Sequence, residues 1–221
     1  MKKKILVFAA HPDDELLGLG GTLIKHVSQG DEVSVVIFTT GVTSRDIDNK
    51  DIQIKKLRKN LINVSKFLKF KKIFYLGLND QKLDEYPIIE IIKKIESIKK
   101  TINPDIIYTH HYSDLNKDHR VSTESVMVAF RPDKKKYKII MYETPSSSEY
   151  AYKNYFTPNY YVDIKKTYKK KVSALYKYYK SEMKTKNHPR SKSYLLALAK
   201  KRGGECGLEY AEAFFMFRDY N

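Results

Sequence analysis

Apolar residues follow two different periods along the first two thirds of this chain. Short apolar runs rich in Ile, Val and Phe are typical of buried strands, whereas the stretches between them place an apolar residue at every third or fourth position, as on one face of a helix. The strand-like runs are 5–9, 33–38, 73–76, 106–109 and 138–142. The first helix-like stretch begins near Pro12, and the others cover 54–68, 88–102 and 118–130. This alternation predicts a Rossmann-like, doubly wound α/β fold, with a mainly parallel sheet and helices on both faces.

The pattern becomes less regular after Pro145. The expected elements are a loop over 146–158, a short strand over 160–162, a helix over 165–183, a helix that Gly203 and Gly204 end, and a last strand over 209–217. A chain of 221 residues can bury one sizeable core. We therefore predict a single domain, in which 1–145 form the core sheet and 146–221 form a C-terminal elaboration of it.

Charge and composition narrow the classes of partner. The formal net charge is +16, but the lysines are scattered through every segment instead of forming one basic stripe, which argues against a nucleic-acid partner. No run approaches the roughly 18 apolar residues of a membrane span. The single cysteine, Cys206, excludes an intramolecular disulfide. We expect a cytoplasmic protein with neither a membrane span nor a nucleic-acid partner.

Chemically versatile residues follow the predicted strands. Residues 10–15, Ala-His-Pro-Asp-Asp-Glu, come after the first strand, and four of the six histidines lie in this segment and in 110–119, which comes after the fourth. Proline and acids at a helix start would by themselves be explained as helix capping. In doubly wound sheets, however, ligands bind beyond the carboxyl ends of the strands. His11 and Asp14 are three positions apart and can face one point, with Asp13 to one side, so the two segments together predict a metal site.

These two segments resemble the signatures of the zinc-dependent N-acetylglucosamine deacetylases that include the PIG-L and LmbE-like proteins. The resemblance implies that His11, Asp14 and His119 hold one Zn²⁺ per chain and that Asp13 is the general base. Fe²⁺ or Co²⁺ can replace zinc in sites of this type. The implied substrate is a small amino sugar, which includes phosphate- and nucleotide-linked forms. Relatives are often trimers or hexamers, so a homo-oligomer is consistent with the resemblance.

One position departs from the family pattern. Many members carry histidine where this chain has Asn116, and that histidine is thought to stabilise the oxyanion or to protonate the leaving amine. Asn116 can donate a hydrogen bond but no proton, so Asp13, once protonated, is the preferred acid. His110 and His111 are further candidates, with unliganded histidines on the rim of the site as the alternative. Asp118, and Asp114 in the same way, can orient a neighbouring donor.

The resemblance also implies substrate contacts. Arg45 and Asp80 lie in loops that contact the sugar in the family, and His188 and Arg190 belong to a His-Pro-Arg-Ser run found in some members. The expected activity is hydrolysis of the acetamide of an N-acetylated sugar to acetate and a free amine. Hydrolysis of another amide, such as a thiol-sugar conjugate, is the alternative within the same fold. A basic nucleic-acid-binding protein with an incidental metal site is the rival from another class.

Overall fold

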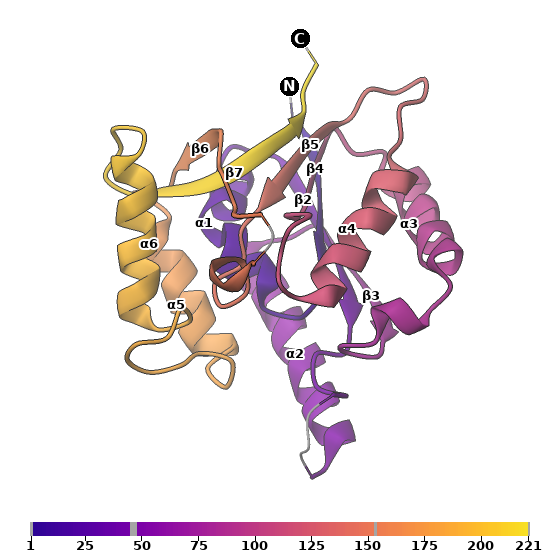
Figure 1. Ribbon diagram of the computed structural model, residues 1–221, viewed down its shortest axis with the longest axis horizontal. Helices are drawn as coiled ribbons and strands as arrows, with labels where there is room; N and C mark the ends of the chain where they lie inside the picture. Colours follow the sequence, from indigo (N-terminus) through magenta and orange to yellow (C-terminus); the bar gives the residue numbers. More distant parts are fainter. Residues whose placement is uncertain (1, 45–47, 153, 221) are drawn as a thin grey trace.

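The computed structural model describes residues 2–44, 48–152 and 154–220. The strands are β1 Lys4–Ala9, β2 Glu32–Thr39, β3 Lys72–Leu78, β4 Ile106–His110, β5 Lys138–Tyr142, β6 Tyr160–Asp163 and β7 Ala211–Arg218. The helices are α1 Asp14–Ser28, α2 Lys50–Leu68, α3 Ile88–Ile102, α4 Lys117–Ala129, α5 Tyr168–Tyr178 and α6 Lys192–Gly204. Each predicted strand and helix is present (Figure 1), with differences only at the ends.

The strands form one sheet in the order β3-β2-β1-β4-β5-β7-β6. Neighbours from β3 through β5 pair in parallel, whereas β7 is antiparallel to both β5 and β6. The predicted Rossmann-like, mainly parallel sheet is therefore confirmed, and the C-terminal segment extends the same sheet. The strand order reverses between β1 and β4, which is where ligands bind in folds of this kind.

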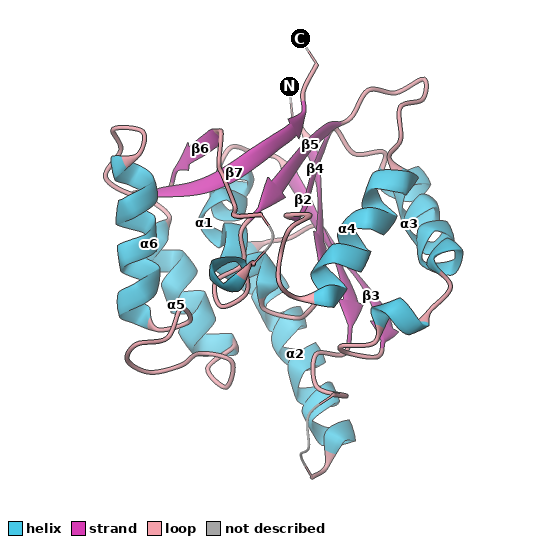
Figure 2. Ribbon diagram, in the orientation of Figure 1, coloured by secondary structure: helices cyan, strands magenta, loops and turns pink. Residues whose placement is uncertain are grey.

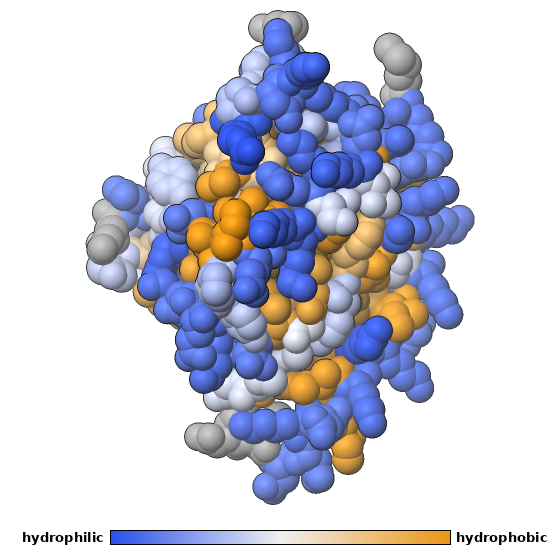
Figure 3. Space-filling model, turned by 90° about the vertical axis from the view of Figure 1, so that its right-hand side faces the viewer, coloured by the Kyte–Doolittle hydropathy of each residue, from blue (hydrophilic) through white to orange (hydrophobic). Residues whose placement is uncertain are grey.

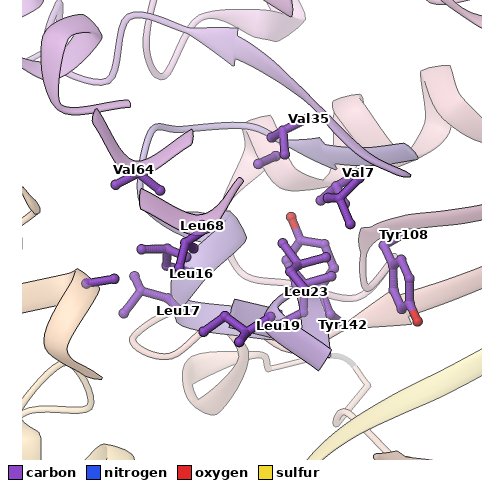
Figure 4. Close-up of a cluster of buried hydrophobic side chains, with 14 of the residues drawn as sticks. Val7, Leu16, Leu17, Leu19, Leu23, Val35, Val64, Leu68, Tyr108 and Tyr142 are labelled. Carbon is purple, nitrogen blue, oxygen red and sulfur yellow. The ribbon is translucent and has the colours of Figure 1, made fainter. Parts of the chain in front are cut away.

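Helices cover the sheet on both faces (Figure 2). Successive side chains of a strand point to opposite faces. Val7 of β1 therefore packs in the core formed with α1, α2 and α5, while Phe8 packs in the core formed with α3 and α4. Figure 4 shows Leu16 and Leu23 of α1 in the first of these cores, together with Val7 and Val35. Two separate apolar cores thus hold the sheet, one on each of its faces.

Helix α1 is broken in the middle, and residues from α5 and β7 form hydrogen bonds with the main-chain groups that the break leaves free. Leu19 leaves the helical conformation (φ −140°, ψ 19°). The buried Lys171 of α5 donates to the carbonyl of Leu17 at 2.8 Å, at the end of the first half. The carboxylate of Glu212, on β7, accepts the main-chain amides of Gly21 and the following residue at 2.9 and 2.7 Å. A cation thus caps the end of one helical segment and an anion the start of the next, as the free carbonyls and amides require.

The main difference from the predicted elements is the length of α5. The helix covers Tyr168–Tyr178 instead of 165–183. Before it, the side chain of Asp163 accepts the amide of Lys165 at 2.8 Å and forms a turn. After it, Tyr179 leaves helical geometry (φ −116°, ψ 31°), and its hydroxyl bonds to a buried carboxylate of the first motif. Side-chain hydrogen bonds therefore determine where this helix begins and ends, and the apolar period overestimates its length.

The two glycines predicted to stop α6 lie inside it. The helix continues to Gly204, and the carbonyl of Gly203 accepts the amide of Leu208 at 2.8 Å. A Cβ atom at Gly203 would lie 2.9 Å from the carbonyl oxygen of Glu209. Gly203 therefore permits a close approach of the chain that follows, and the helix continues through both glycines.

Hydrophilic side chains cover most of the α3 and α4 side of the molecule, with separate apolar patches between them (Figure 3). Within the described residues, no helix combines the length and the apolar character that crossing a bilayer needs.

Candidate metal centre

Three donor atoms from the two predicted segments meet at the carboxyl edge of β1 and β4. His11 follows β1, Asp14 is the first residue of α1, and His119 lies in the first turn of α4. Asp14 Oδ2 is 3.2 Å from His11 Nδ1 and 3.3 Å from His119 Nε2, and the two imidazole nitrogens are 3.2 Å apart. Zinc bonds of about 2.0–2.1 Å imply edges of about 3.3–3.4 Å between ligands of a regular tetrahedron. The three atoms therefore match one face of such a tetrahedron.

The far side of the His11 ring is held by two carboxylates. Its Nε2 lies 3.0 Å from both Asp80 Oδ1 and Asp118 Oδ2. Asp118 is itself fixed, since its side chain accepts the amides of Gln81 at 2.7 Å and Leu83 at 3.1 Å. Because carboxylates only accept, Nε2 carries a hydrogen, and loss of the proton from Nδ1 would leave that nitrogen to bind a metal ion together with Asp14 and His119.

His119 has a corresponding carboxylate behind it. Its Nδ1 is 3.1 Å from Asp114 Oδ1, although the angle is poor for a hydrogen bond. Asp114 accepts the amide of Asn116 at 2.9 Å and the hydroxyls of Ser147 and Ser148, the latter at 3.0 Å. Both candidate histidine ligands thus have the outer carboxylate that orients such a ring.

The electrostatics of the cluster favour a bound cation. Burial lowers the pKa of His11, but hydrogen bonds to Asp118, Asp14 and Asp80 outweigh it and raise that pKa well above its usual value. Burial is likewise outweighed at His119, where Asp114 and Asp14 raise the pKa to about 9. Asp14 Oδ1 is a buried oxygen without a hydrogen-bond partner among the described residues. Two imidazoles, a buried carboxylate and an excess of negative charge fit a divalent metal ion.

Asp13 lies beside the three donors but points elsewhere, as predicted. Its main chain has φ 132° and ψ −27°, a conformation that residues with a side chain rarely adopt. Arg190 Nη1 donates to Asp13 Oδ2 at 2.8 Å. Burial raises the pKa of Asp13 to about 7, while the positive charge of Arg190 acts against the rise. A carboxyl group with this pKa suits proton transfer near neutral pH.

A polar cleft of about 140 Å³ opens next to this cluster. Its walls come from the loops that follow β1, β2, β3 and β4, from α2 and from the C-terminal segment. The lining residues are His11, Pro12, Asp13, Gly41, Ser44, Leu57, Asp80, Gln81, Asn116, Glu182 and Arg190. The predicted contacts Asp80 and Arg190 therefore share one cleft with Asp13.

Other predicted residues have different positions. Arg45 lies outside the described residues. His188 is not among the described residues that line the cleft, and its Nδ1 accepts the amide of Arg190 at 3.0 Å, so it shapes the turn that presents that arginine. Asn116 is the N-cap of α4 and accepts the amide of Asp118 at 2.8 Å. Glu143, which also follows a strand, instead forms two hydrogen bonds with Arg202.

The prediction of rim histidines is wrong, because both residues are buried. The His110 ring stacks on that of His119 with centroids 3.8 Å apart, and its Nε2 accepts the amide of Ala10 at 3.0 Å. Burial lowers the pKa of His110 well below its usual value, and it lowers the pKa of His111 to about 4. The His110 ring thus packs behind the candidate ligands, and burial disfavours the positively charged, doubly protonated form of both histidines.

Two residues near the cluster were missed from the sequence. Glu182 lines the cleft, and the Tyr179 hydroxyl donates to Glu15 at 2.8 Å. Both were expected to be ordinary helical positions. An apolar period does not distinguish a buried carboxylate or hydroxyl with a partner from its neighbours, and the sequence holds no other signal for them.

A Rossmann-like sheet that gathers two histidines and a carboxylate at its carboxyl edge, beside a second carboxylate, has the donor set of a metal-dependent hydrolase. Comparison with known proteins identifies the family. The profile described as PIG-L, GlcNAc-PI de-N-acetylase, matches residues 6–130. The chain belongs to the PIG-L family, its matched relatives are named as deacetylases, and its clustered His and Asp side chains could hold a metal ion.

Individual relatives agree with this assignment. An uncharacterized deacetylase of Escherichia coli K12, YaiS, is 31% identical over 153 residues, which cover 66% of this chain and 76% of YaiS. The diacetylchitobiose deacetylase of Thermococcus kodakarensis is 28% identical over 95% of this chain and 81% of its own length. The N,N'-diacetylchitobiose deacetylase structure from Pyrococcus horikoshii has the same fold, with a TM-score of 0.80, 24% identity and coverage of 97% and 84%.

Proposed function

We propose that this protein is a zinc-dependent deacetylase of N-acetylated sugars, with one Zn²⁺ per chain held by His11, Asp14 and His119. The triangle of donor atoms, with edges of 3.2–3.3 Å, is the observation that carries the proposal. Three protein ligands leave an open position, as catalytic zinc sites require. Fe²⁺ or Co²⁺ can occupy the same donors.

A divalent ion in this site supplies a Lewis acid that polarises the acetamide carbonyl and acidifies a water molecule. The Asp13 carboxylate takes a proton from that water molecule while the oxygen of the water attacks the carbonyl carbon. The same carboxyl group then gives the proton to the sugar nitrogen as the carbon–nitrogen bond breaks. The products are acetate and a free amine.

Other residues orient these groups. Asp118 holds His11 in the tautomer that directs Nδ1 at the metal. Asn116 uses its side-chain oxygen to cap α4, which leaves its amide nitrogen to donate to the oxyanion from the cleft wall. Asp80 and Arg190 offer an acceptor and donors to sugar hydroxyl groups. Arg45 is assigned to the same substrate region from the family resemblance, and His188 is proposed to act on it indirectly, by holding the turn that presents Arg190.

The substrate is proposed to be a small amino sugar. The relative from T. kodakarensis is named a diacetylchitobiose deacetylase, and the cleft of about 140 Å³ is strongly polar. We propose further that residues 146–221 belong to the same domain as 1–145, and that the protein is cytoplasmic and can form a homo-oligomer. A phosphate- or nucleotide-linked sugar is tested in the same assay.

The test is a deacetylation screen with zinc-loaded protein. N-acetylglucosamine, diacetylchitobiose, nucleotide-linked N-acetylhexosamines and N-acylated thiol-sugar conjugates are compared by acetate release and amine formation. Acetate from an N-acetylated sugar supports the proposal, whereas cleavage of thiol-sugar amides alone replaces it with the alternative amidase. Salt-dependent binding of DNA without amidase activity would replace it with a nucleic-acid-binding function.

A further inference from the structure

A buried carboxylate connects the Asp13 backbone to the C-terminal segment. Glu15 is fully buried, and its Oε2 accepts the main-chain amide of Asp13 at 3.0 Å. Its Oε1 accepts the hydroxyl of Tyr179 at 2.8 Å. Tyr179 is also fully buried and comes directly after α5. Two hydrogen bonds thus link residues that are more than 160 positions apart in the chain.

This connection acts on a backbone that needs support. A φ of 132° at Asp13 is unfavourable for any residue with a Cβ atom. Such conformations persist only when the surrounding contacts hold them, and they are common at catalytic positions. The Glu15 carboxylate holds the amide on one side of Asp13, and Asp13 O accepts the amides of Leu16 and Leu17 at 3.0 and 2.9 Å on the other.

The side chain of Asp13 is held separately. Arg190 donates to its Oδ2 at 2.8 Å and to the Ser146 hydroxyl at 2.6 Å. This contact fixes the carboxylate, whereas Glu15 fixes the main chain from which the carboxylate extends. Both contacts involve the segment that follows α5, since Arg190 lies in it and Glu15 is held by Tyr179, its first residue.

We propose that Tyr179 is a positioning residue for the reaction, which acts through Glu15 on the main chain of Asp13. The inference rests on the proposed function, in which Asp13 moves the proton. The Tyr179 hydroxyl holds the Glu15 carboxylate in the rotamer that receives the Asp13 amide. Loss of the hydroxyl releases that rotamer and misdirects the base, while the metal ligands and the cleft wall stay in place.

The test compares Tyr179→Phe with Tyr108→Phe. Tyr108 is a matched control, because it is equally buried and its hydroxyl is 3.0 Å from His26 Nε2, near the opposite edge of the sheet. Both variants are expected to lose a similar few degrees in Tm. Tyr179→Phe alone should lose about 10- to 100-fold in kcat with KM changed by less than about twofold, the scale of a small misplacement of a catalytic group. Zinc content should equal that of the unchanged protein in both.

A double variant shows whether Tyr179 acts through Asp13. Tyr179→Phe should cause no further loss of kcat when it is added to Asp13→Asn, since residues that act as a unit are not additive. Additive losses, or equal kcat in Tyr179→Phe and the unchanged protein, would overturn the positioning role. If Asp13→Asn alone leaves turnover normal, the base assignment in the proposed function fails instead, and with it this inference.

A Glu15 pair tests the same connection if Tyr179→Phe does not fold. Glu15→Gln keeps an oxygen for the Asp13 amide and places an amide group against the Tyr179 oxygen, so it should retain kcat within about threefold. Glu15→Met fills the same volume without these bonds and should reproduce the kcat loss at unchanged zinc content. Equal kcat in the two Glu15 variants would overturn the inference.

Discussion

Asp13 and Asp14 are adjacent in the sequence, and the structure gives them different tasks that one pair of substitutions separates. Asp14→Asn removes the carboxylate that lies 3.2–3.3 Å from both imidazole nitrogens. Even outer partners of metal ligands are worth about 10–100-fold in affinity, so this variant should lose more than about 10²-fold in zinc affinity. Asp13→Asn should keep the zinc, because Asp13 points away from the triangle and toward Arg190.

The size of the effect on turnover follows from the role of Asp13. General acid–base catalysis contributes about 10²–10⁴-fold, equivalent to about 2.7–5.4 kcal/mol in activation free energy. The asparagine oxygen can still accept from Arg190, so the turn and the cleft should survive the substitution. Since Asp13 is proposed to transfer the proton twice, single-turnover and steady-state rates should fall together.

The assay is paired for each variant. Zinc per chain is measured by elemental analysis after exposure to a fixed free zinc concentration, and single-turnover deacetylation is measured under zinc saturation. Near-normal turnover in Asp13→Asn at full zinc content would refute the base assignment and direct attention to Glu182, a further carboxylate that lines the cleft. Full zinc content in Asp14→Asn would refute the donor triangle.

Three further outcomes are expected. Zinc binding should release protons, because the raised pKa values of His119 and His11 make protons compete with the metal. Below about pH 9 the zinc affinity should therefore fall about tenfold per pH unit for each proton displaced. Calorimetry in buffers of different ionisation enthalpy measures the proton release, and a pH-independent affinity would contradict it. Arg190→Gln should move the acidic limb of the kcat/KM profile to higher pH, since Arg190 lowers the pKa of Asp13; an unmoved limb would show that the limb does not report this carboxyl group. Glu212→Ala should lower the free energy of unfolding by about 3–5 kcal/mol, because it leaves a buried lysine unpaired and the break in α1 uncapped; urea denaturation measures the loss, and a change below about 1 kcal/mol would show that the break needs no cap.

The core elements could be predicted from the sequence because their apolar periods are strict. Isoleucine recurs at helical spacing from Ile88 to Ile102, and the helix has these bounds. Topology alone predicted that His11 and the 110–119 segment lie at one edge, and the carboxyl ends of β1 and β4 are neighbours in the sheet. The choice of His119 within that segment came from the family resemblance.

The rest of the site depends on contacts that no local pattern encodes. The 179–191 segment is irregular, and its contributions to the cleft, Glu182 and Arg190, depend on how the chain returns over the sheet. The position of His110 was misjudged for a related reason. It is the last residue of β4, and a histidine at a strand end does not reveal whether its ring packs inward against His119 or outward.

The break in α1 makes the first motif dependent on the end of the chain. A nascent chain that stops after α6 already contains every proposed metal ligand, but it lacks the β7 carboxylate of Glu212 that receives the amides after the break. The amides at the start of the second half of α1 therefore depend on an acceptor carried by β7, which pairs with β5 in the sheet. The helix that supplies Asp14 to the proposed metal site is thus tied, through its break, to a strand residue 191 positions away from Gly21.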